Sequence, residues 1–270
     1  MQELPGFERQ MSLSRMSLGP VGRALGLLAP LLLTATLARS TEPESGSMRD
    51  KLREITHTQC VPHWLKAKDP APCLRVTLTS QEPGLRGFCV LPDRKGGAHL
   101  LLIPLEPVSG IESADAWDAQ GPNYFQDAWE ARDEVAKIAG RALPRQAIGL
   151  AINSKYTRSQ DQLHIHMECL GVNVHEQLVA HADAIGERWT PLVIGGTPYH
   201  ALRVMGTDLG RSNPFNLLAQ GLPGARESMD AYTMLVAGMS FKEGPGFVVL
   251  AGKFAPGSEL LLDSTCALAR

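Results

Sequence analysis

The sequence contains no excess of basic side chains and few aromatic ones. Its 270 residues carry 26 Lys and Arg against 28 Asp and Glu, for a formal net charge of -2, and aromatic residues make up 6% of the chain. Neither the basic patch nor the stacking surface of a nucleic-acid-binding protein is therefore expected. The hydrophobic share of 44% is large enough for a buried core and excludes a disordered chain.

Long apolar runs are scarce as well. A single one, at residues 24–38, lies near the N-terminus and follows Arg9, Arg15 and Arg23. A positively charged segment, an apolar core and small residues at its end are typical of an export signal. The run is shorter than the ~20 residues of a transmembrane helix. We therefore expect residues 1–40 to be an export signal that is either cleaved or retained as a membrane anchor, residues 41–50 to be a linker, and residues 51–270 to be the exported domain.

The sequence also lacks a Cys-x-x-Cys pair, which excludes a zinc ribbon and a thioredoxin-type redox motif. Its five cysteines fit an oxidising compartment after export. Cys60 and Cys73 enclose a short proline-rich segment, and Cys169 and Cys266 can then connect the C-terminus to the middle of the domain. We hypothesise these two disulfides, with Cys89 as a buried free thiol in an apolar stretch.

Hydrophobic patterns predict short strands and helices without regular βαβ alternation. Apolar residues recur at helical spacing over 124–139, and Gly140 stands where a helix-ending glycine belongs. Residues 87–91 and 98–104 are predicted to form a hairpin with glycine at its turn, and His99 is interpreted as a structural histidine at the hairpin edge. Further strands are expected at 147–152, 162–170, 232–240 and 247–254, and further helices at 50–60 and 175–189. This succession predicts an α+β fold with a mostly antiparallel sheet, flanking helices and no internal repeat.

The predicted strand at 162–170 alternates strictly between apolar and polar residues. Successive side chains of a strand point to opposite faces, so one face of this strand is apolar. The other face carries Gln162, His164, His166 and Glu168. Three interpretations remain open. The face is simply solvated; or His164 and His166 bind a metal together with Glu168 or His200; or one imidazole is a nucleophile.

A nucleophilic imidazole needs little from the rest of the chain. Neutral histidine attacks phosphorus through one nitrogen when the other nitrogen donates to a fixed acceptor. Neutral donors nearby then hold the phosphate oxygens. The turn and strand that lead to His166 offer such groups in Asn153, Gln160, Gln162 and His164, and the turn also offers the cations Lys155 and Arg158.

The spacing Asn153-x6-Gln160-x3-His164-x-His166 resembles the signature of the histidine-triad superfamily of nucleotide hydrolases and transferases. The segment 98–104, which ends in Ile-Pro, is similar to a characteristic strand of that superfamily. The resemblance covers residues 87–170 and implies a histidine-triad-like core, with His166 as nucleophile and His164 in the first triad place. Glu168 departs from the pattern, because a third histidine is expected there. The resemblance implies no cofactor and no bound metal.

A wider set of segments resembles the bacterial CDP-diacylglycerol pyrophosphatase family. They are the N-terminal leader, the Cys60–Cys73 segment, 123–125, 129–133, 150–154, His164-Ile165-His166 with Cys169, 188–189 and Cys266. This resemblance implies a C-terminal extension beyond the core. It also implies hydrolysis of the lipid-nucleotide CDP-diacylglycerol to CMP and phosphatidate at a membrane, through a cytidylyl-histidine on His166, with Glu168 as a third catalytic residue.

The same resemblance places the protein at the bacterial inner membrane, held by one N-terminal anchor with the catalytic domain exported. Cleavage of the leader would instead release it to the periplasm. No nucleic-acid partner is expected, and the oligomeric state is left open. Two alternative functions remain: a broader nucleotide diphosphate hydrolase or nucleotidyltransferase, and a periplasmic metal-binding module that uses His164, His166 and Glu168.

Overall fold

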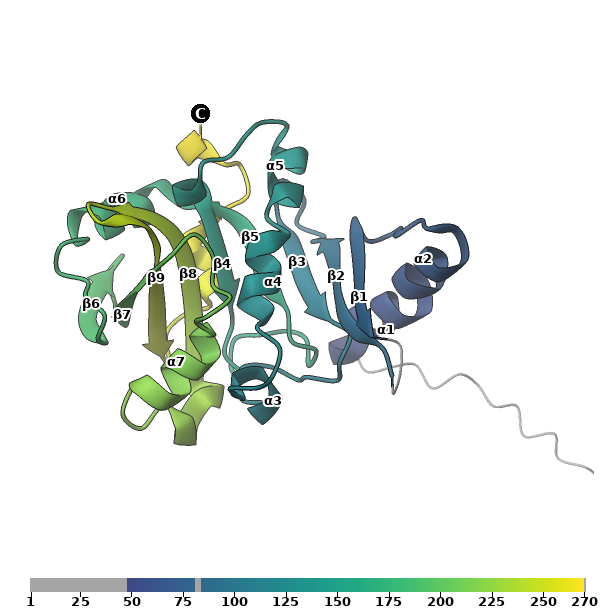
Figure 1. The fold of residues 1–270 in the computed structure, drawn as a ribbon, viewed down its shortest axis with the longest axis horizontal. Helices are drawn as coiled ribbons and strands as arrows, with labels where there is room; N and C mark the ends of the chain where they lie inside the picture. Colours follow the sequence, from purple (N-terminus) through teal and green to yellow (C-terminus); the bar gives the residue numbers. More distant parts are fainter. Residues whose placement is uncertain (1–47, 81–83, 270) are drawn as a thin grey trace, which may run out of the picture. The chain divides into compact units, whose positions relative to one another are not determined.

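A computed structural model describes residues 48–80 and 84–269, so the predicted leader at 1–40 lies outside the described residues. Ten strands form one sheet, and each pairing between them is antiparallel. The predicted α+β fold with a mostly antiparallel sheet is thereby confirmed (Figure 1). None of the described helices has the length and apolar character needed to cross a bilayer.

The strands are β1 (Arg75–Ser80), β2 (Arg86–Pro92), β3 (Leu100–Pro104), β4 (Ile148–Ile152), β5 (Ile165–Leu170), β6 (Thr190–Ile194), β7 (Thr197–Met205), β8 (Tyr232–Phe241), β9 (Gly244–Lys253) and β10 (Leu262–Asp263). The α-helices are α1 (Lys51–Ile55), α2 (Val61–Ala67), α3 (Ala114–Trp117), α4 (Tyr124–Glu130), α5 (Asp133–Ala139), α6 (Val172–Ala180) and α7 (Pro214–Gly221). Short helical turns include η2 (Thr56–Cys60), η4 (Arg226–Ala231) and η5 (Ser258–Leu261).

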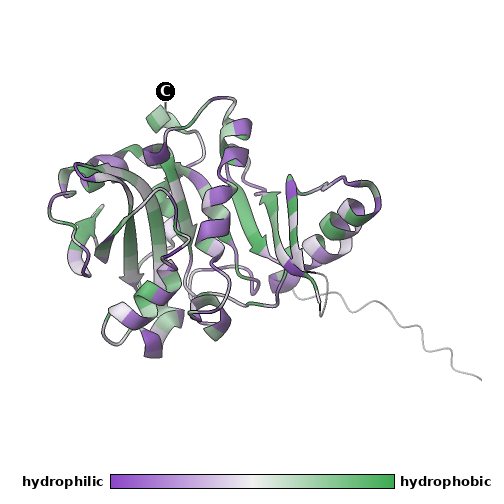
Figure 2. Ribbon diagram, viewed as in Figure 1, coloured by the Kyte–Doolittle hydropathy of each residue, from purple (hydrophilic) through white to green (hydrophobic). Residues whose placement is uncertain are grey.

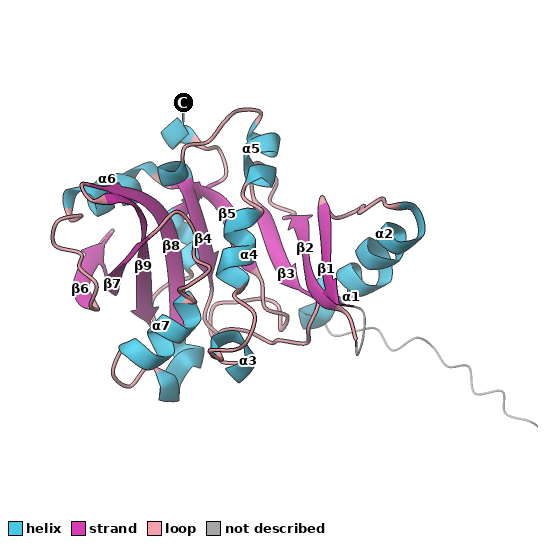
Figure 3. Ribbon diagram, viewed as in Figure 1, coloured by secondary structure: helices cyan, strands magenta, loops and turns pink. Residues whose placement is uncertain are grey.

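Apart from the outer strand β1, the strand order is symmetric about the pairing of β4 with β8. It runs β1-β2-β3-β5-β4-β8-β9-β7-β6, so the half β2-β3-β5-β4 is mirrored by the half β6-β7-β9-β8. Each half consists of a hairpin, a helical segment and a second hairpin (Figure 3). No internal repeat is predicted from the sequence. The topology nevertheless repeats, because the two halves connect their strands in the same way but carry different side chains.

Helices and apolar clusters cover the two faces of the sheet differently. On one face, α4 and α7 pack Phe125 against Phe215, with 4.7 Å between ring centroids, within the largest core cluster. On the other face are two separate clusters, one below α6 and one below the helical segment that contains α1 and α2. Figure 2 shows β2 and β3, which separate the core clusters of the two faces, mainly in the green of hydrophobic residues. The polar face of β5 lies between the two separate clusters, because His166 pairs with Leu101 of one cluster and with Ala151 of the other.

Several predicted boundaries differ from those observed. The helix predicted at 124–139 is divided into α4 and α5; at the break, the Arg132 guanidinium donates to the Trp129 carbonyl at 2.5 Å and lies over the Trp129 ring. Gly140 ends α5 in the left-handed region, with φ 67°, as predicted. The helix predicted at 175–189 is the shorter α6, and the predicted strand at 162–170 begins only at Ile165. The strands β1, β6 and β7 are not predicted from the sequence.

Two disulfides hold the periphery of the domain. Cys60 is bonded to Cys73 and Cys169 to Cys266, and Cys89 is a buried free thiol, which confirms the hypothesised pairing. The Cys169–Cys266 bond joins the C-terminal segment to β5, and β10 also pairs with the end of β5. The C-terminal segment, yellow in Figure 1, therefore runs beside the strand that carries the predicted chemistry.

Candidate active site

The polar residues of the predicted catalytic strand are buried. Gln162, His164, His166 and Glu168 are each at most 5% exposed. The interpretation of this face as a solvated one is therefore wrong. Buried imidazole and carboxyl groups lose their hydration, so each of them needs a partner inside the protein.

His166 finds its partner in the residue that precedes β3. Its Nδ1 lies 2.8 Å from His99 Nε2, and the same His99 nitrogen lies 3.1 Å from Glu168 Oε1. The register of β3 against β5 pairs Leu100 with Met167, and its continuation places His99 opposite Glu168. Two strands thus bring His99, His166 and Glu168 together as one buried cluster, which we call the His99 cluster.

His164 is fixed by the chain just before β5. Its Nδ1 lies 2.8 Å from the carbonyl oxygen of Gln162, and since a carbonyl only accepts, this nitrogen carries the proton. The His164 ring lies edge-on to His166 at 5.1 Å between centroids. Gln162 itself donates to the carbonyls of Pro104 and Glu106, at 2.9 Å each, and so holds the end of β3.

Burial shifts the pKa values of the cluster in opposite directions. It lowers the pKa of His166 well below 6.5, and the neighbouring charges of His164, His99 and Lys95 lower it further. Burial likewise lowers the pKa of His99 and of His164. It raises the pKa of Glu168 to about 8. Burial therefore favours uncharged imidazoles and a protonated carboxyl group in this cluster.

Asn153 and Lys155 lie in the turn that follows β4. Asn153 is buried, and its Oδ1 has no hydrogen-bond partner among the described residues. A Cβ atom on Gly257 would lie 2.8 Å from that oxygen, so the C-terminal segment runs directly against Asn153. Lys155 is exposed, and its backbone N–H donates to Asp230.

Arg158 and Gln160 are bound to other parts of the chain. The Arg158 guanidinium donates two hydrogen bonds to the Glu112 carboxylate, at 2.6 and 2.7 Å, and pairs with Asp161. The Gln160 side chain donates to the carbonyl of Met48 and accepts from the N–H of Leu52. The Gln160 bonds attach the turn to the N-terminal helical segment, and the Arg158 bonds attach it to the loop between β3 and α3. Both residues would have to exchange these partners to bind a phosphate.

Three groups near His166 are missing from the sequence-based site: His99, Lys95 and Glu259. Glu259 Oε2 lies 3.3 Å from His166 Nε2, and Glu259 Oε1 lies 3.3 Å from Lys95 Nζ. His99 stands out in the sequence as the one ionisable side chain of an apolar strand, which is a usable signal. Glu259 gives no local signal, because it is far from β5 in the sequence.

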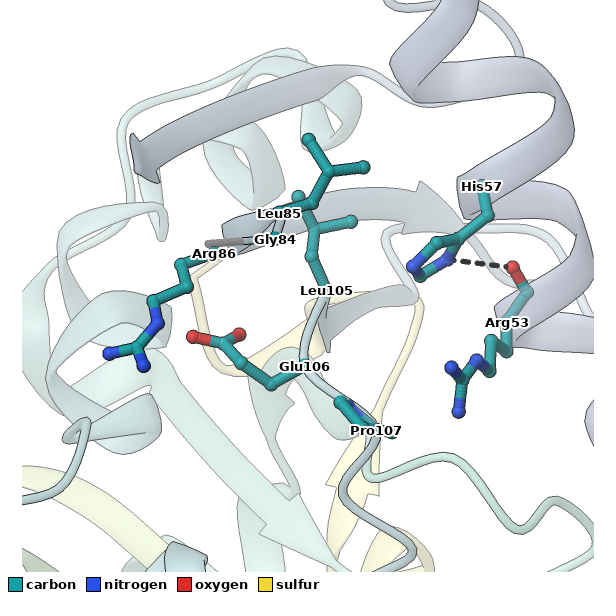
Figure 4. Close-up of a pocket in the computed structure, with 8 residues that line it drawn as sticks. All are labelled: Arg53, His57, Gly84, Leu85, Arg86, Leu105, Glu106 and Pro107. Carbon is teal, nitrogen blue, oxygen red and sulfur yellow. Dashed lines mark hydrogen bonds between the residues drawn. The ribbon is translucent and has the colours of Figure 1, made fainter. Parts of the chain in front are cut away.

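A cavity of the described structure lies away from these residues. It has a volume of about 330 Å³ and lies between α1 and the segments that precede β2 and follow β3 (Figure 4). Its walls are formed by Arg53, His57, Gly84, Leu85, Arg86, Leu105, Glu106 and Pro107. None of the predicted site residues lines this cavity.

The His99 cluster is also the group that could hold a metal ion. One ligand atom from each of His99, His166 and Glu168 lies within 4.8 Å of the others. His164, which the sequence suggests as a ligand, is not in this group. The two nitrogens are only 2.8 Å apart. Two imidazole nitrogens on a tetrahedral zinc, each about 2.1 Å from the metal, would be about 3.4 Å apart, so metal binding requires the rings to separate.

Buried uncharged imidazoles beside a carboxyl group of raised pKa are typical of an enzyme's active site. The chain matches the family model described as "CDP-diacylglycerol pyrophosphatase" over residues 47–270. A CDP-diacylglycerol pyrophosphatase of Yersinia pestis is 40% identical over 228 residues, which cover 82% of this chain and 85% of the relative. The chain therefore belongs to the CDP-diacylglycerol pyrophosphatase family and is a hydrolase, which confirms the family resemblance inferred from the sequence.

Proposed function

We propose that this protein hydrolyses CDP-diacylglycerol to CMP and phosphatidate through a covalent cytidylyl intermediate on His166. The substrate follows from the family to which the chain belongs. The observation that carries the mechanism is the burial, charge and hydrogen bonding of the His166 imidazole. His166 is buried and uncharged, its Nδ1 is held at 2.8 Å by His99, and its Nε2 has no hydrogen bond among the described residues.

The proton on Glu168 sets the tautomer of His166 in this mechanism. A protonated Glu168, 3.1 Å from His99 Nε2, carries no charge that would hold a proton on this nitrogen, so His99 Nε2 is the acceptor and His166 donates from Nδ1. The lone pair of His166 is then on Nε2, where it can attack. An ionised Glu168 would instead keep a proton on His99 Nε2, leave His166 Nδ1 as an acceptor and move the His166 proton to Nε2. The carboxyl group in the third triad place therefore acts in its neutral form.

The reaction has two displacements. His166 Nε2 attacks the phosphorus next to cytidine, the bond from that phosphorus to the bridging oxygen breaks, and phosphatidate leaves with the oxygen. Water then attacks the same phosphorus, the P–N bond breaks, and CMP leaves. His164 Nε2, which has a lone pair because Nδ1 carries the proton, is suited to take the proton of that water. Asn153 and Lys155 are proposed phosphate ligands, and Gln160, Arg158 and Gln162 position the turn and strand that carry them.

A trapped intermediate tests the proposal directly. The enzyme is mixed with CDP-diacylglycerol, denatured during turnover without acid, since a phosphoramidate is acid-labile, and digested for mass spectrometry. A cytidylyl group on the peptide that contains His166 is the expected result. A phosphatidyl group on that peptide, or an unmodified peptide under conditions of rapid turnover, would contradict the mechanism.

The pH profile provides an independent prediction. Activity should persist below pH 6.5, because the pKa of His166 lies well below that value, and it should fall as pH rises through about 8, where Glu168 ionises. Glu168→Gln should remove this alkaline fall, because the Gln side chain stays uncharged at every pH. The measurement is kcat/KM against pH for both enzymes. If activity falls at the same alkaline midpoint in the variant, the ionisation responsible belongs to a group other than Glu168.

We also propose that the protein acts at the inner membrane, with residues 1–40 as its anchor. The apolar run at 24–38 and the lipid part of the proposed substrate support this location, and the two disulfides agree with export. A cleaved leader and a periplasmic protein are the alternative. Membrane fractionation of the full chain, with N-terminal sequencing of the product, distinguishes the two.

A metal-binding module is the second candidate function, because the ligand atoms of the His99 cluster lie close together. Treatment with a chelator, followed by elemental analysis, separates the two candidates. The covalent mechanism predicts full CDP-diacylglycerol hydrolysis in metal-free protein, to within about twofold of the untreated enzyme. Loss of activity with the metal, and its recovery on adding zinc, would favour the metal site and imply that the rings of His99 and His166 separate around it.

A further inference from the structure

The nucleophilic nitrogen proposed above faces a carboxylate of the C-terminal segment. Glu259 Oε2 lies 3.3 Å from His166 Nε2 without hydrogen-bond alignment, and Glu259 Oε1 lies 3.3 Å from Lys95 Nζ. One carboxylate therefore bridges an ammonium group and the imidazole nitrogen. An attacking nitrogen needs the substrate's phosphorus on this side of the ring, so the carboxylate occupies the place of a phosphate.

The fold brings Lys95 to this place by specific contacts. The loop between β2 and β3 turns at Gly96 and Gly97, both at positive φ, and the Lys95 N–H donates to Asp93 at 2.7 Å. Ala98 N–H donates to the carbonyl of Ser264 at 2.9 Å, and a Cβ atom on Gly97 would lie 2.9 Å from that same oxygen. The loop with Lys95 and the segment with Glu259 are thus joined directly.

The charge of Lys95 reaches the whole His99 cluster. Burial is the main influence on the pKa of each member, and it raises the pKa of Glu168 while lowering those of His99 and His166. Lys95 lowers the pKa of all three groups. Arg158, the buried cation of the turn, is already neutralised by Glu112 and Asp161. Lys95 is therefore better placed to receive an anion.

We infer that Lys95 and His166 Nε2 form a binding position for a phosphate group of the substrate, and that Glu259 occupies this position until the phosphate displaces it. The inference rests on the proposed function. A phosphate oxygen replaces the carboxylate oxygen on the ammonium group, and no covalent bond changes. Glu259 can move because its side chain is 24% exposed and lies on the short turn η5 between Gly257 and β10.

The test uses the product CMP as the probe. Inhibition by CMP and KM for CDP-diacylglycerol in mixed micelles are measured for Lys95→Gln, Lys95→Arg and Glu259→Gln. Lys95→Gln should raise both constants about 10- to 100-fold, the range of one charge-assisted hydrogen bond, and Lys95→Arg should restore most of the affinity. Glu259→Gln should lower the CMP inhibition constant about two- to fivefold, because a competing ion pair is lost. Lys242→Gln, which removes an exposed ion pair with Asp183, is the matched control and should change neither constant.

An unchanged CMP constant in Lys95→Gln, or weaker CMP binding in Glu259→Gln, would overturn the inference. The covalent adduct on His166 keeps this outcome separate from the proposed function. If the wild-type enzyme forms the adduct and Lys95→Gln binds CMP normally, only the phosphate position is refuted. If the wild-type enzyme forms no adduct, the proposed mechanism itself fails, whatever Lys95 does.

Discussion

His166→Ala is expected to lower CDP-diacylglycerol hydrolysis by about 10⁴-fold or more and to abolish the covalent adduct. The imidazole is the proposed nucleophile, so its removal eliminates both displacements and leaves only substrate positioning by the remaining groups. The methyl group of alanine also leaves the hydrogen-bonding nitrogen of His99 without its partner at 2.8 Å. The measurement combines initial rates with mass spectrometry of the peptide that contains residue 166.

His181→Ala is the matched control, because His181 is exposed at the end of α6 and has no part in the proposed reaction. It should retain both activity and the adduct. Circular dichroism and thermal unfolding establish that His166→Ala is folded, so that lost activity reflects lost chemistry. Hydrolysis by folded His166→Ala at a rate near that of the wild type would refute the assignment of His166 as the nucleophile. An adduct at another residue would assign the nucleophile to that residue instead.

Local patterns predict most of the central strands of this fold. The alternating run that becomes β5 and the apolar runs that become β4, β8 and β9 are placed to within a few residues. The hairpin β6–β7 is not predicted, because Pro191 and Pro198 interrupt its two strands, although Gly195 and Gly196 form a two-residue turn typical of hairpins. The symmetric strand order cannot be recognised from the sequence either. In the second half β9 takes the place of β5, but β9 contains no histidine.

The active site is predictable only where it is local in the sequence. His164, His166 and Glu168 follow from one alternating strand, and the structure places all three in its buried interior. Glu259 reaches His166 only because a disulfide and β10 bring the C-terminal segment back to β5. A turn residue such as Arg158 has the right charge for a phosphate, but the sequence does not reveal that Glu112 already neutralises it.

His99 is the position where the structure changes the sequence interpretation most. Interpreted from the sequence as a structural histidine, it contacts both His166 and Glu168. His99→Phe should lower kcat about 10²- to 10³-fold with little change in KM, because the ring still fills the space but no longer accepts the His166 proton. The loss of a group that fixes a catalytic tautomer lowers kcat by up to about 10⁴-fold in other enzymes, so the expected effect lies below that limit. The measurement is kcat and KM together with the rate of adduct formation in a single turnover.

His99→Gln separates positioning from packing. A Gln side chain can offer an acceptor oxygen to His166 Nδ1, so it should retain at least about tenfold more activity than His99→Phe, although it fills the buried site less well. If His99 only packs, the order reverses, because phenylalanine is the better buried side chain and glutamine leaves an unsatisfied amide. Nitrogen NMR of the imidazoles gives a second readout: the His166 proton should reside on Nδ1 in the wild type and in His99→Gln, and should shift toward Nε2 in His99→Phe. A proton already on Nε2 in the wild-type enzyme would contradict the assigned role of His99 and Glu168, even if the activities followed the predicted order.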